Sequence, residues 1–191
     1  MTTVRKNLIM TQDAPALLEP ALHELWRYWQ QLRTANSNSL PQKVALQIAG
    51  LRTVLPNIVL SEHVNADTVL IRLAGSAVEA MTNRTLSGVN LLDLTPPEQR
   101  TRIGKVYKNL FSMPCGFYIS ETIRIDDGKK FILSALVLPL ADKKGVPCFT
   151  VGQYAVSRNG FEEASYQGGA VIEHRQIDQF GYIDIGHGTP S

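Results

Sequence analysis

Hydrophobic residues near the N-terminus recur at helical spacing. Leu18, Leu22, Leu25, Trp29 and Leu32 follow one another at alternating intervals of four and three residues. Residues spaced in this way share one face of an α-helix, so the pattern predicts an amphipathic helix. The residues before the stripe, including Asp13 and Pro15, fit the start of such a helix. A polar stretch from Arg33 to Ser39 then ends it.

The next apolar positions predict a short helix followed by a β-hairpin. Between Leu40 and Pro56, a few apolar residues share one helical face, and the Leu-Pro pair ends the segment. Residues 57–64 and 68–73 are two runs rich in β-branched and apolar residues, separated by a turn at Asn65-Ala66-Asp67. Two such runs around a short polar turn are typical of an antiparallel hairpin.

The second half of the chain predicts a long helix that leads into three strands. Thr95-Pro96-Pro97-Glu98 has the sequence of a capping box, and the apolar face that follows extends a helix to Ser112. Three apolar or alternating runs come next, with Asp127-Gly128 as a hairpin turn between the first two. The strands are expected over residues 116–125, 131–140 and 148–157, with two weak strands at 171–177 and 181–185.

Strands in two consecutive runs, with helices inserted between them, indicate an α+β fold with an antiparallel sheet. The long helix at 96–112 is the natural cover for one face of that sheet. A ligand would lie between the helix and the sheet.

Composition narrows the class of protein. The chain has 191 residues, of which 44% are hydrophobic, and a formal net charge of +2. These values fit one globular domain and give no sign of the basic stripe that nucleic-acid binders carry, so no nucleic-acid partner is expected. No run approaches the ~20 apolar residues of a membrane span, and Met1 to Met10 does not resemble a signal peptide. We therefore expect no membrane association and a cytoplasmic protein.

Few residues suggest chemistry. Gly75-Ser76 lacks the G-x-S-x-G spacing of a nucleophile elbow, so we expect Ser76 to cap a helix. The four histidines show no metal-ligand spacing, and no metal site is expected. Cys115 and Cys148 begin two strands that a third separates, which places them roughly 10 Å apart, too far for a disulfide. We expect buried structural cysteines, with a redox-sensing role as the alternative.

Arg72 leaves two interpretations open. It lies in the middle of a predicted strand among apolar residues. Its side chain either faces solvent or pairs with an acid or an anion inside the fold, with Glu62 and Glu121 as candidate acids. A small α+β enzyme would need Arg72, Glu121 and His63 to converge in one pocket. No catalytic residue is predicted, and we expect a protein that is not an enzyme.

Several short motifs together carry a resemblance to a known family. They are Tyr28 to Arg33, Leu40-Pro41, Leu55 to Leu60, Arg72 to Ser76, and Leu86-Ser87-Gly88. The chain resembles a family of small bacterial proteins that each carry one PAS-like domain preceded by a helix. It departs from the family pattern at Gln42-Lys43, at Ser76 and at Met81-Thr82-Asn83.

The resemblance implies a PAS-like fold, with a five-stranded antiparallel sheet, helices on one face and an amphipathic helix before the core. It also implies a sensory or signalling role in which the domain binds a small molecule or a protein partner. No cofactor is specified. We expect residues 1–37 to form an N-terminal segment, 38–158 the PAS-like domain and 159–191 a C-terminal extension.

Two residue sets follow from these expectations. The apolar stripe of the N-terminal helix either packs on its own sheet or forms a homodimer interface, through Leu18, Leu22, Leu25, Trp29 and Leu32. A ligand pocket is predicted beneath the long helix, although plain core packing is the alternative for each residue. The pocket candidates are Arg72, Leu91, Val106, Tyr107, Leu110, Phe117, Ile119, Leu133 and Val151. A pure interaction module without a ligand is the alternative function.

Overall fold

A single antiparallel sheet organises the protein. The computed structural model describes residues 18–95, 97–125, 128–158, 162–163 and 172–190. The strands lie in the order β2-β1-β5-β4-β3-β7, and a two-residue strand, β6, pairs with β5. Their bounds are β1 Ile58–Asn65, β2 Thr68–Ala74, β3 Gly116–Ile125, β4 Lys130–Ala141, β5 Pro147–Arg158, β6 Glu162–Glu163 and β7 Ile172–Ile183.

The predicted hairpin and meander are confirmed as β1–β2 and β3–β4–β5. The sheet has more strands than the five expected, because the C-terminal part of the chain returns to it. β7 pairs along the whole of β3, from Gly116 opposite Ile183 to Ile125 opposite Ile172. The two weak strands that the sequence suggested therefore form one long strand at the edge of the sheet, while Val171 lies outside the described residues.

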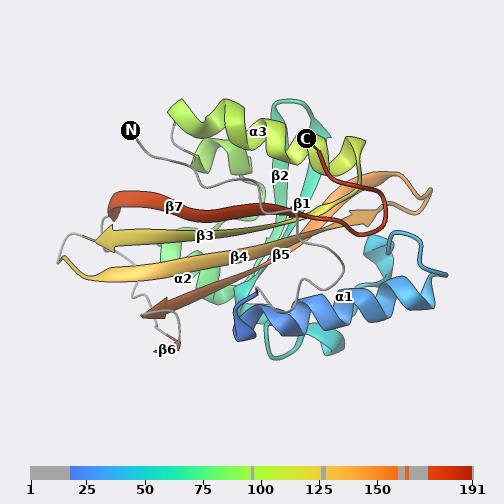
Figure 1. Cartoon of the computed structure of the whole chain (residues 1–191), viewed down its shortest axis with the longest axis horizontal. Helices are drawn as coiled ribbons and strands as arrows, with labels where there is room; N and C mark the ends of the chain where they lie inside the picture. Colours follow the sequence, from blue (N-terminus) through green and yellow to red (C-terminus); the bar gives the residue numbers. More distant parts are fainter. Residues whose placement is uncertain (1–17, 96, 126–127, 159–161, 164–171, 191) are drawn as a thin grey trace.

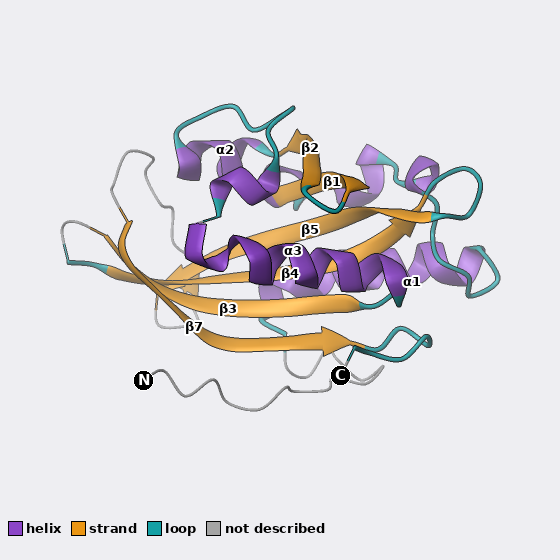
Figure 2. Ribbon diagram, turned by 90° about the horizontal axis from the view of Figure 1, so that it is seen from above, coloured by secondary structure: helices purple, strands orange, loops and turns teal. Residues whose placement is uncertain are grey.

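Helices α2 (Ser76–Thr82) and α3 (Pro97–Ser112) cover one face of the sheet, together with a 3-10 turn, η6 (Leu91–Leu94). We call the face beneath α2 and α3 the helix-covered face. Figure 2 shows α3 lying across the central strands on this side. Leu110 of α3 is fully buried beside Phe117 and Val137 of the sheet. The predicted long helix is thus confirmed as the cover of the sheet. The capping box predicted at its start includes Pro96, which lies outside the described residues, and the Thr95 hydroxyl donates to the Leu91 carbonyl.

The N-terminal helix covers the opposite face. It consists of a 3-10 turn, η2 (Pro20–Leu22), and α1 (His23–Ala35), which lies across the sheet from α3 (Figure 1). The predicted stripe packs against strands β4 and β5, with Leu22, Leu25 and Trp29 at 0% exposure and Leu18 also buried, whereas Leu32 is only half-buried. A dimer through this stripe would require α1 to leave its own sheet, so the structure favours the intramolecular alternative. Asp13 and Pro15 lie outside the described residues.

Polar contacts as well as apolar ones hold α1 on the sheet. The Trp29 Nε1 donates to the Pro139 carbonyl at 3.0 Å. The buried Gln153 side chain accepts from the Leu25 amide and donates to the Ala21 carbonyl. One side chain of β5 thus binds the backbone of η2 and α1 at two points, and this fixes the register of the helix on the sheet.

The segment between Leu40 and Pro56 differs from the prediction. It forms three 3-10 turns, η3 (Lys43–Ala45), η4 (Ile48–Leu51) and η5 (Leu55–Asn57), rather than an α-helix. The Tyr28 hydroxyl of α1 accepts from the Gln47 amide and donates to the Gln47 carbonyl, so tertiary contacts set the path of the segment. A side chain at Gly50 would overlap the Tyr28 ring, which explains a glycine there.

Two of the family motifs prove to be structural partners. The Gly75 amide donates to the Ile58 carbonyl, and a Cβ on Gly75 would lie 2.2 Å from the Leu55 carbonyl oxygen. The Leu-Pro and Gly-Ser motifs therefore touch through their backbones. Gly75 precedes α2 as its N-cap, and the cap has no side-chain hydrogen bond, so the expectation that Ser76 caps this helix is wrong.

Glu19 supplies a polar contact whose strength depends on pH. Its carboxylate accepts from the Ser134 hydroxyl at 2.6 Å, and burial raises its pKa above the ordinary value of 4.5 although this hydrogen bond lowers it. The folded chain therefore holds the Glu19 proton more tightly than the unfolded chain. The stability that the protonated acid contributes is complete below about pH 4.5 and is lost as the pH rises through the folded pKa.

We expect Glu19→Gln to stabilise the protein at pH 7, because the amide is uncharged and its oxygen still accepts from Ser134. The gain should stay below about 1 kcal/mol, since the side chain is only half-buried. It should vanish below about pH 4.5. Urea unfolding at pH 4 and pH 7 measures the difference, and a gain of equal size at both pH values would contradict the assignment.

Candidate functional site

The face of the sheet beneath α3 carries a cluster of aromatic residues. Tyr107 of α3 lies edge-on to Phe117 of β3, with ring centroids 6.0 Å apart, and Phe117 lies 5.9 Å from Phe180 of β7. Phe180 in turn contacts Tyr182 at 5.2 Å. Because alternate residues of a strand face the same side, these rings come from one side of β3 and β7. They join the buried side of α3 to the edge of the sheet.

A second cluster on the same face lies over the far halves of β3 and β4. Ile123, Phe131 and Leu133 are buried there, and Met81 of α2 and Tyr154 of β5 pack against them. Glu121 points to this face as well, because it lies opposite Leu133 in the sheet and two residues from Ile123. Its side chain is only 7% exposed. A buried carboxylic acid among apolar walls is the kind of polar group that orients a ligand in a binding site.

Seven of the nine predicted pocket residues lie in two clusters on the side of the sheet that α2 and α3 cover. Val106, Tyr107, Leu110 and Phe117 lie together in the aromatic cluster, with Leu91 and Ile119 packed against it. Leu133 lies in the neighbouring cluster on the same face. Each of them packs in its own cluster as a core residue, the alternative that the sequence left open, and their role toward a ligand stays a prediction.

Val151 and Arg72 need correction. Val151 is buried on the opposite face, in the cluster that α1 covers. The alternation along β5 was evident from the sequence, but which alternate positions face α3 was not. Arg72 pairs with Glu62 at 2.6 Å and is 44% exposed, on the edge strand β2. Both interpretations of Arg72 therefore hold in part, since it is paired with one of the predicted acids at the surface.

The three residues considered for an enzyme site do not converge. Arg72 alternates with the buried Val69 and Ile71 and so points away from the helix-covered face, whereas Glu121 points toward it. His63 stacks on Phe111 of α3, with ring centroids 4.7 Å apart, and burial lowers the pKa of its imidazole. His63 thus packs against the end of the covering helix. Within the described ranges, no three His, Cys, Asp or Glu side chains group closely enough to hold a metal ion.

Both cysteines are free thiols in the structure, as expected from their separation. Cys115 is fully buried, and burial together with the charge of Asp184 raises its pKa to about 12. Cys148 is partly exposed, so the expectation of two buried cysteines is confirmed only for Cys115, although partial burial still raises the pKa of Cys148. Thiol reagents react with the thiolate, so both side chains should be slow at neutral pH.

We therefore expect a native thiol titration at pH 7.5 to detect no rapid reaction, and to detect two thiols once the chain is unfolded in denaturant. In Cys148→Ser, the rate of thiol labelling in the folded protein should be close to zero, because the remaining Cys115 is buried. Rapid labelling of either cysteine in the folded protein would contradict this and would support the redox-sensing alternative.

Sequence reasoning missed the buried polar residues on the α1 side of the sheet. Gln153, Ser134 and Ser120 are buried on the α1 side of β5, β4 and β3, and the Ser134 and Ser120 hydroxyls lie 3.3 Å apart. The signal was present, because each polar residue interrupts an apolar run at a position that alternation assigns to a face. Without knowledge of what covered that face, the sequence could not distinguish a solvated position from a buried polar contact.

Comparison with solved structures gives low similarity. The chain is similar to the light-state aureochrome 1 LOV domain, with 22% identity, a TM-score of 0.41 and coverage of 60% of this chain and 91% of that one. It is also similar to a LOV protein of Rhodobacter sphaeroides, with 13% identity, a TM-score of 0.41 and coverage of 56% and 64%. A PAS domain from Colwellia psychrerythraea is similar with 12% identity, a TM-score of 0.39 and coverage of 62% of this chain and 98% of that one.

A comparison with curated protein sequences finds no match. Within the described residues, no helix has the length and apolar character required to cross a membrane. A family model described as a PAS domain matches residues 17–155, which span most of the chain and include α1, the covering helices, strands β1 to β4 and most of β5. The chain therefore belongs to the PAS domain family.

Proposed function

We propose that this protein is a sensory PAS module that binds a small molecule on the helix-covered face and passes the effect of binding to α1. One observation supports this proposal most strongly. Strands β3 and β5 each carry polar side chains on both faces at neighbouring positions. Glu121 follows Ser120, and Tyr154 follows Gln153, so each pair places one residue beneath the covering helices and the next beneath α1.

The ligand side of the proposal rests on the second cluster. Ile123 and Leu133 provide an apolar wall, and the Glu121 carboxyl and the Tyr154 phenol provide polar groups beside it. Burial raises the pKa of Tyr107 well above 10, and the nearby Tyr154 adds to this effect, so the Tyr107 phenol stays protonated at neutral pH and is able to donate a hydrogen bond. A ligand with acceptor atoms and an apolar body fits this set.

The output side rests on the hydrogen bonds that dock α1. Gln153 holds the Leu25 amide and the Ala21 carbonyl, and Ser134 holds Glu19. These contacts depend on the exact position of β4 and β5, because hydrogen bonds weaken steeply with distance and angle. A ligand that shifts these strands would change the docking of α1, provided that it binds one arrangement more tightly than the other.

Hydrogen exchange tests the coupling between the two faces. Leu133→Trp enlarges a side chain on the helix-covered face and should displace β4. We expect the amides of α1 to exchange about three-fold faster or more in this variant, relative to the amides of the β1–β2 hairpin, because local opening of α1 becomes easier. The hairpin serves as the internal reference for any general loss of stability.

Val146→Trp is the matched control, since Val146 lies in the β4–β5 turn and is 53% exposed. It should leave the ratio of α1 to hairpin exchange unchanged. An unchanged ratio in Leu133→Trp, with the variant still folded, would contradict the proposal that the two faces are coupled.

A further inference from the structure

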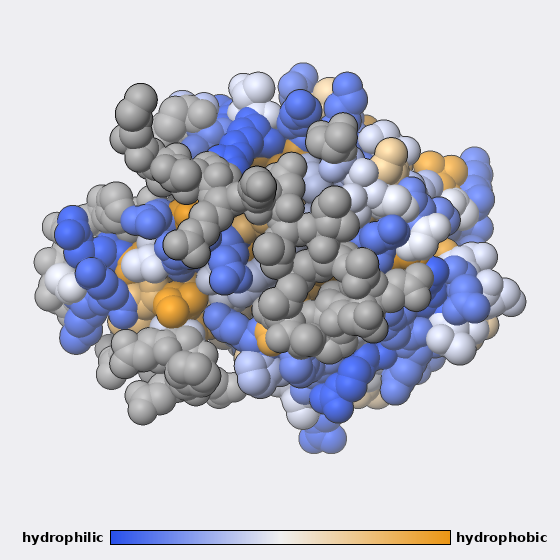
Figure 3. All heavy atoms as spheres, viewed as in Figure 1, coloured by the Kyte–Doolittle hydropathy of each residue, from blue (hydrophilic) through white to orange (hydrophobic). Residues whose placement is uncertain are grey.

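A groove of about 690 Å³ lies on the outer side of α3, away from the helix-covered face of the sheet. One wall is α3 itself, with Arg100, Lys105 and Lys108. The other is formed by the β1–β2 turn with Asp67 and by η6 with Asp93. The surface of the protein in the view of Figure 3 is largely hydrophilic, with small apolar areas. The groove is defined by its shape and by the charged residues on its two walls.

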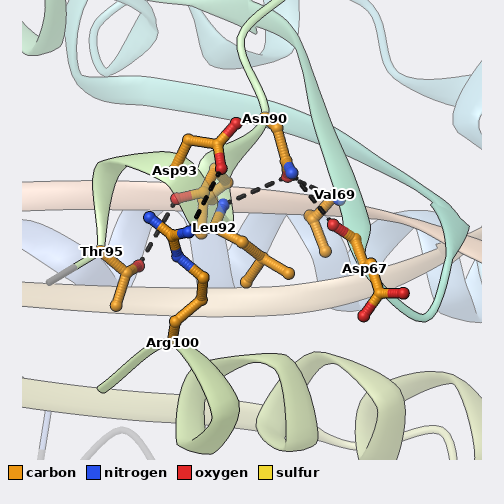
Figure 4. Close-up of polar contacts among 8 residues, drawn as sticks. Asp67, Val69, Asn90, Leu92, Asp93, Thr95 and Arg100 are labelled. Carbon is orange, nitrogen blue, oxygen red and sulfur yellow. Dashed lines mark hydrogen bonds and ion pairs between the residues drawn. The ribbon is translucent and has the colours of Figure 1, made fainter. Parts of the chain in front are cut away.

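The wall opposite α3 is held rigidly by one side chain. The Asn90 Oδ1 accepts from the Val69 and Leu92 amides, and its Nδ2 donates to the Asp67 carbonyl at 3.0 Å. Asn90 thus ties the β1–β2 turn to η6. Figure 4 shows this arrangement, with the Asp67 side chain directed from the turn toward α3. The backbone of Asp67 makes the hydrogen bonds that fix this residue, so its carboxylate takes no part in them.

Two of the charged groups form an ion pair with each other across the groove, and three others do not. Arg100 lies 3.9 Å from Asp93, and this pair joins the two walls at one end of the groove (Figure 4). Within the described part of the chain, Lys105, Lys108 and the Asp67 carboxylate have no ion-pair partner within 4 Å. The remaining set is therefore two cations on α3 and one anion on the facing wall.

The positive charge of the protein is concentrated on this helix. The sequence of α3 contains Arg100, Arg102, Lys105 and Lys108 and a single acid, Glu98, which gives it a net charge of +3 against +2 for the whole chain. The rest of the chain thus has a net charge of −1. An anionic ligand is therefore drawn to α3 more strongly than to the remainder of the surface.

We propose that the groove binds a small ligand with two anionic groups and one ammonium group, as in an amino dicarboxylic acid. The two anionic groups lie against Lys105 and Lys108, and the ammonium faces Asp67. This ligand places an opposite charge against each of Lys105, Lys108 and Asp67. An extended polyanion such as a nucleic acid does not, since its phosphates would meet Asp67 and Asp93 along the facing wall. The volume is within the range of small-molecule sites.

The lining gives the groove room and an apolar floor. Gly104 of α3 lies between Arg100 and Lys108 on the groove side, and a Cβ there would meet only the Leu92 side chain, at 3.8 Å. The buried Leu92 forms the floor. The charged side chains are exposed, so each contact is worth little in water and we expect dissociation constants on the order of millimolar.

An amide NMR titration of the full chain at low ionic strength tests the proposal, with L-glutamate and glutarate as probes. Glutarate has the two carboxylates of glutamate without the ammonium group. We expect both to shift the amides of residues 66–67, 92–93 and 100–109, with L-glutamate binding about two- to five-fold more tightly, the effect of one exposed ion pair. The helix-covered face should not respond, which separates this site from the proposed sensory one.

Variants assign the charges. Asp67→Asn keeps the turn, because the backbone of Asp67 makes its hydrogen bonds, and it should abolish the preference for L-glutamate while glutarate still binds. Lys105→Gln with Lys108→Gln should weaken both probes. The control is Lys143→Gln with Lys144→Gln, which removes two exposed lysines in the β4–β5 turn. The proposal is overturned if no groove amide shifts, or if Asp67→Asn leaves the preference intact.

Discussion

Replacing Trp29 with alanine should destabilise the protein by about 3–5 kcal/mol, the range for truncating a large buried aromatic residue. Trp29 is fully buried on the sheet, stacks on Trp26 with centroids 6.2 Å apart, and donates to the Pro139 carbonyl. The substitution leaves a cavity beneath α1 and removes the donor for a buried carbonyl. Urea unfolding followed by circular dichroism measures the loss.

Trp29→Phe separates the two contributions, since it keeps an aromatic ring and removes only the Nε1 donor and part of the volume. We expect it to be clearly more stable than the alanine variant. The experiment also decides between the two roles of the stripe. If Trp29→Ala lost less than about 1 kcal/mol, or if its effect depended on protein concentration, α1 would pack on a second copy rather than on its own sheet.

Replacing Gly75 with alanine should cost at least about 2 kcal/mol, because the added methyl group has nowhere to go. Its Cβ would lie 2.2 Å from the Leu55 carbonyl oxygen and 2.3 Å from that of Pro56. Both are backbone atoms, so the contact is relieved only by moving η5 away from the start of α2. Thermal and urea unfolding of the variant measure the effect.

Gly104→Ala is the matched control for this substitution. A Cβ there meets only a leucine methyl at 3.8 Å, and Gly104 lies inside α3, where alanine is favoured over glycine by roughly 0.5–1 kcal/mol. The control should therefore be as stable as the unmodified protein or more stable. Equal effects at the two glycines would show that the Leu-Pro and Gly-Ser motifs are not in contact.

Periodicity predicted most of the fold because one face of each long element is buried. Most of the stripe from Leu18 to Leu32 lies in η2 and α1, and the three runs after Cys115 became the meander within about one residue at each end. The helix predicted between Leu40 and Pro56 was wrong. Its path depends on contacts with Tyr28 that are distant in sequence, which local pattern does not report.

The candidate site was less predictable, for a geometric reason. Alternation separates the residues of a strand into two sets, but it does not say which set a given helix covers. Val151 was assigned to the wrong face for this reason, and Gln153, two residues later on that same face, was not recognised as a contact of α1. The groove along α3 was missed because its walls come from three separate segments whose residues are exposed and individually unremarkable.

Native mass spectrometry of the freshly purified full chain tests the central claim most directly. The account predicts a non-covalently bound small molecule that leaves when the chain is unfolded. The bound fraction should fall in Glu121→Gln, which replaces the carboxyl group on the helix-covered face by an amide of similar shape, and should persist in the Val146→Trp control. Chains that carry no small molecule, before and after incubation with a cell extract, would contradict the account and favour a module that binds only other proteins.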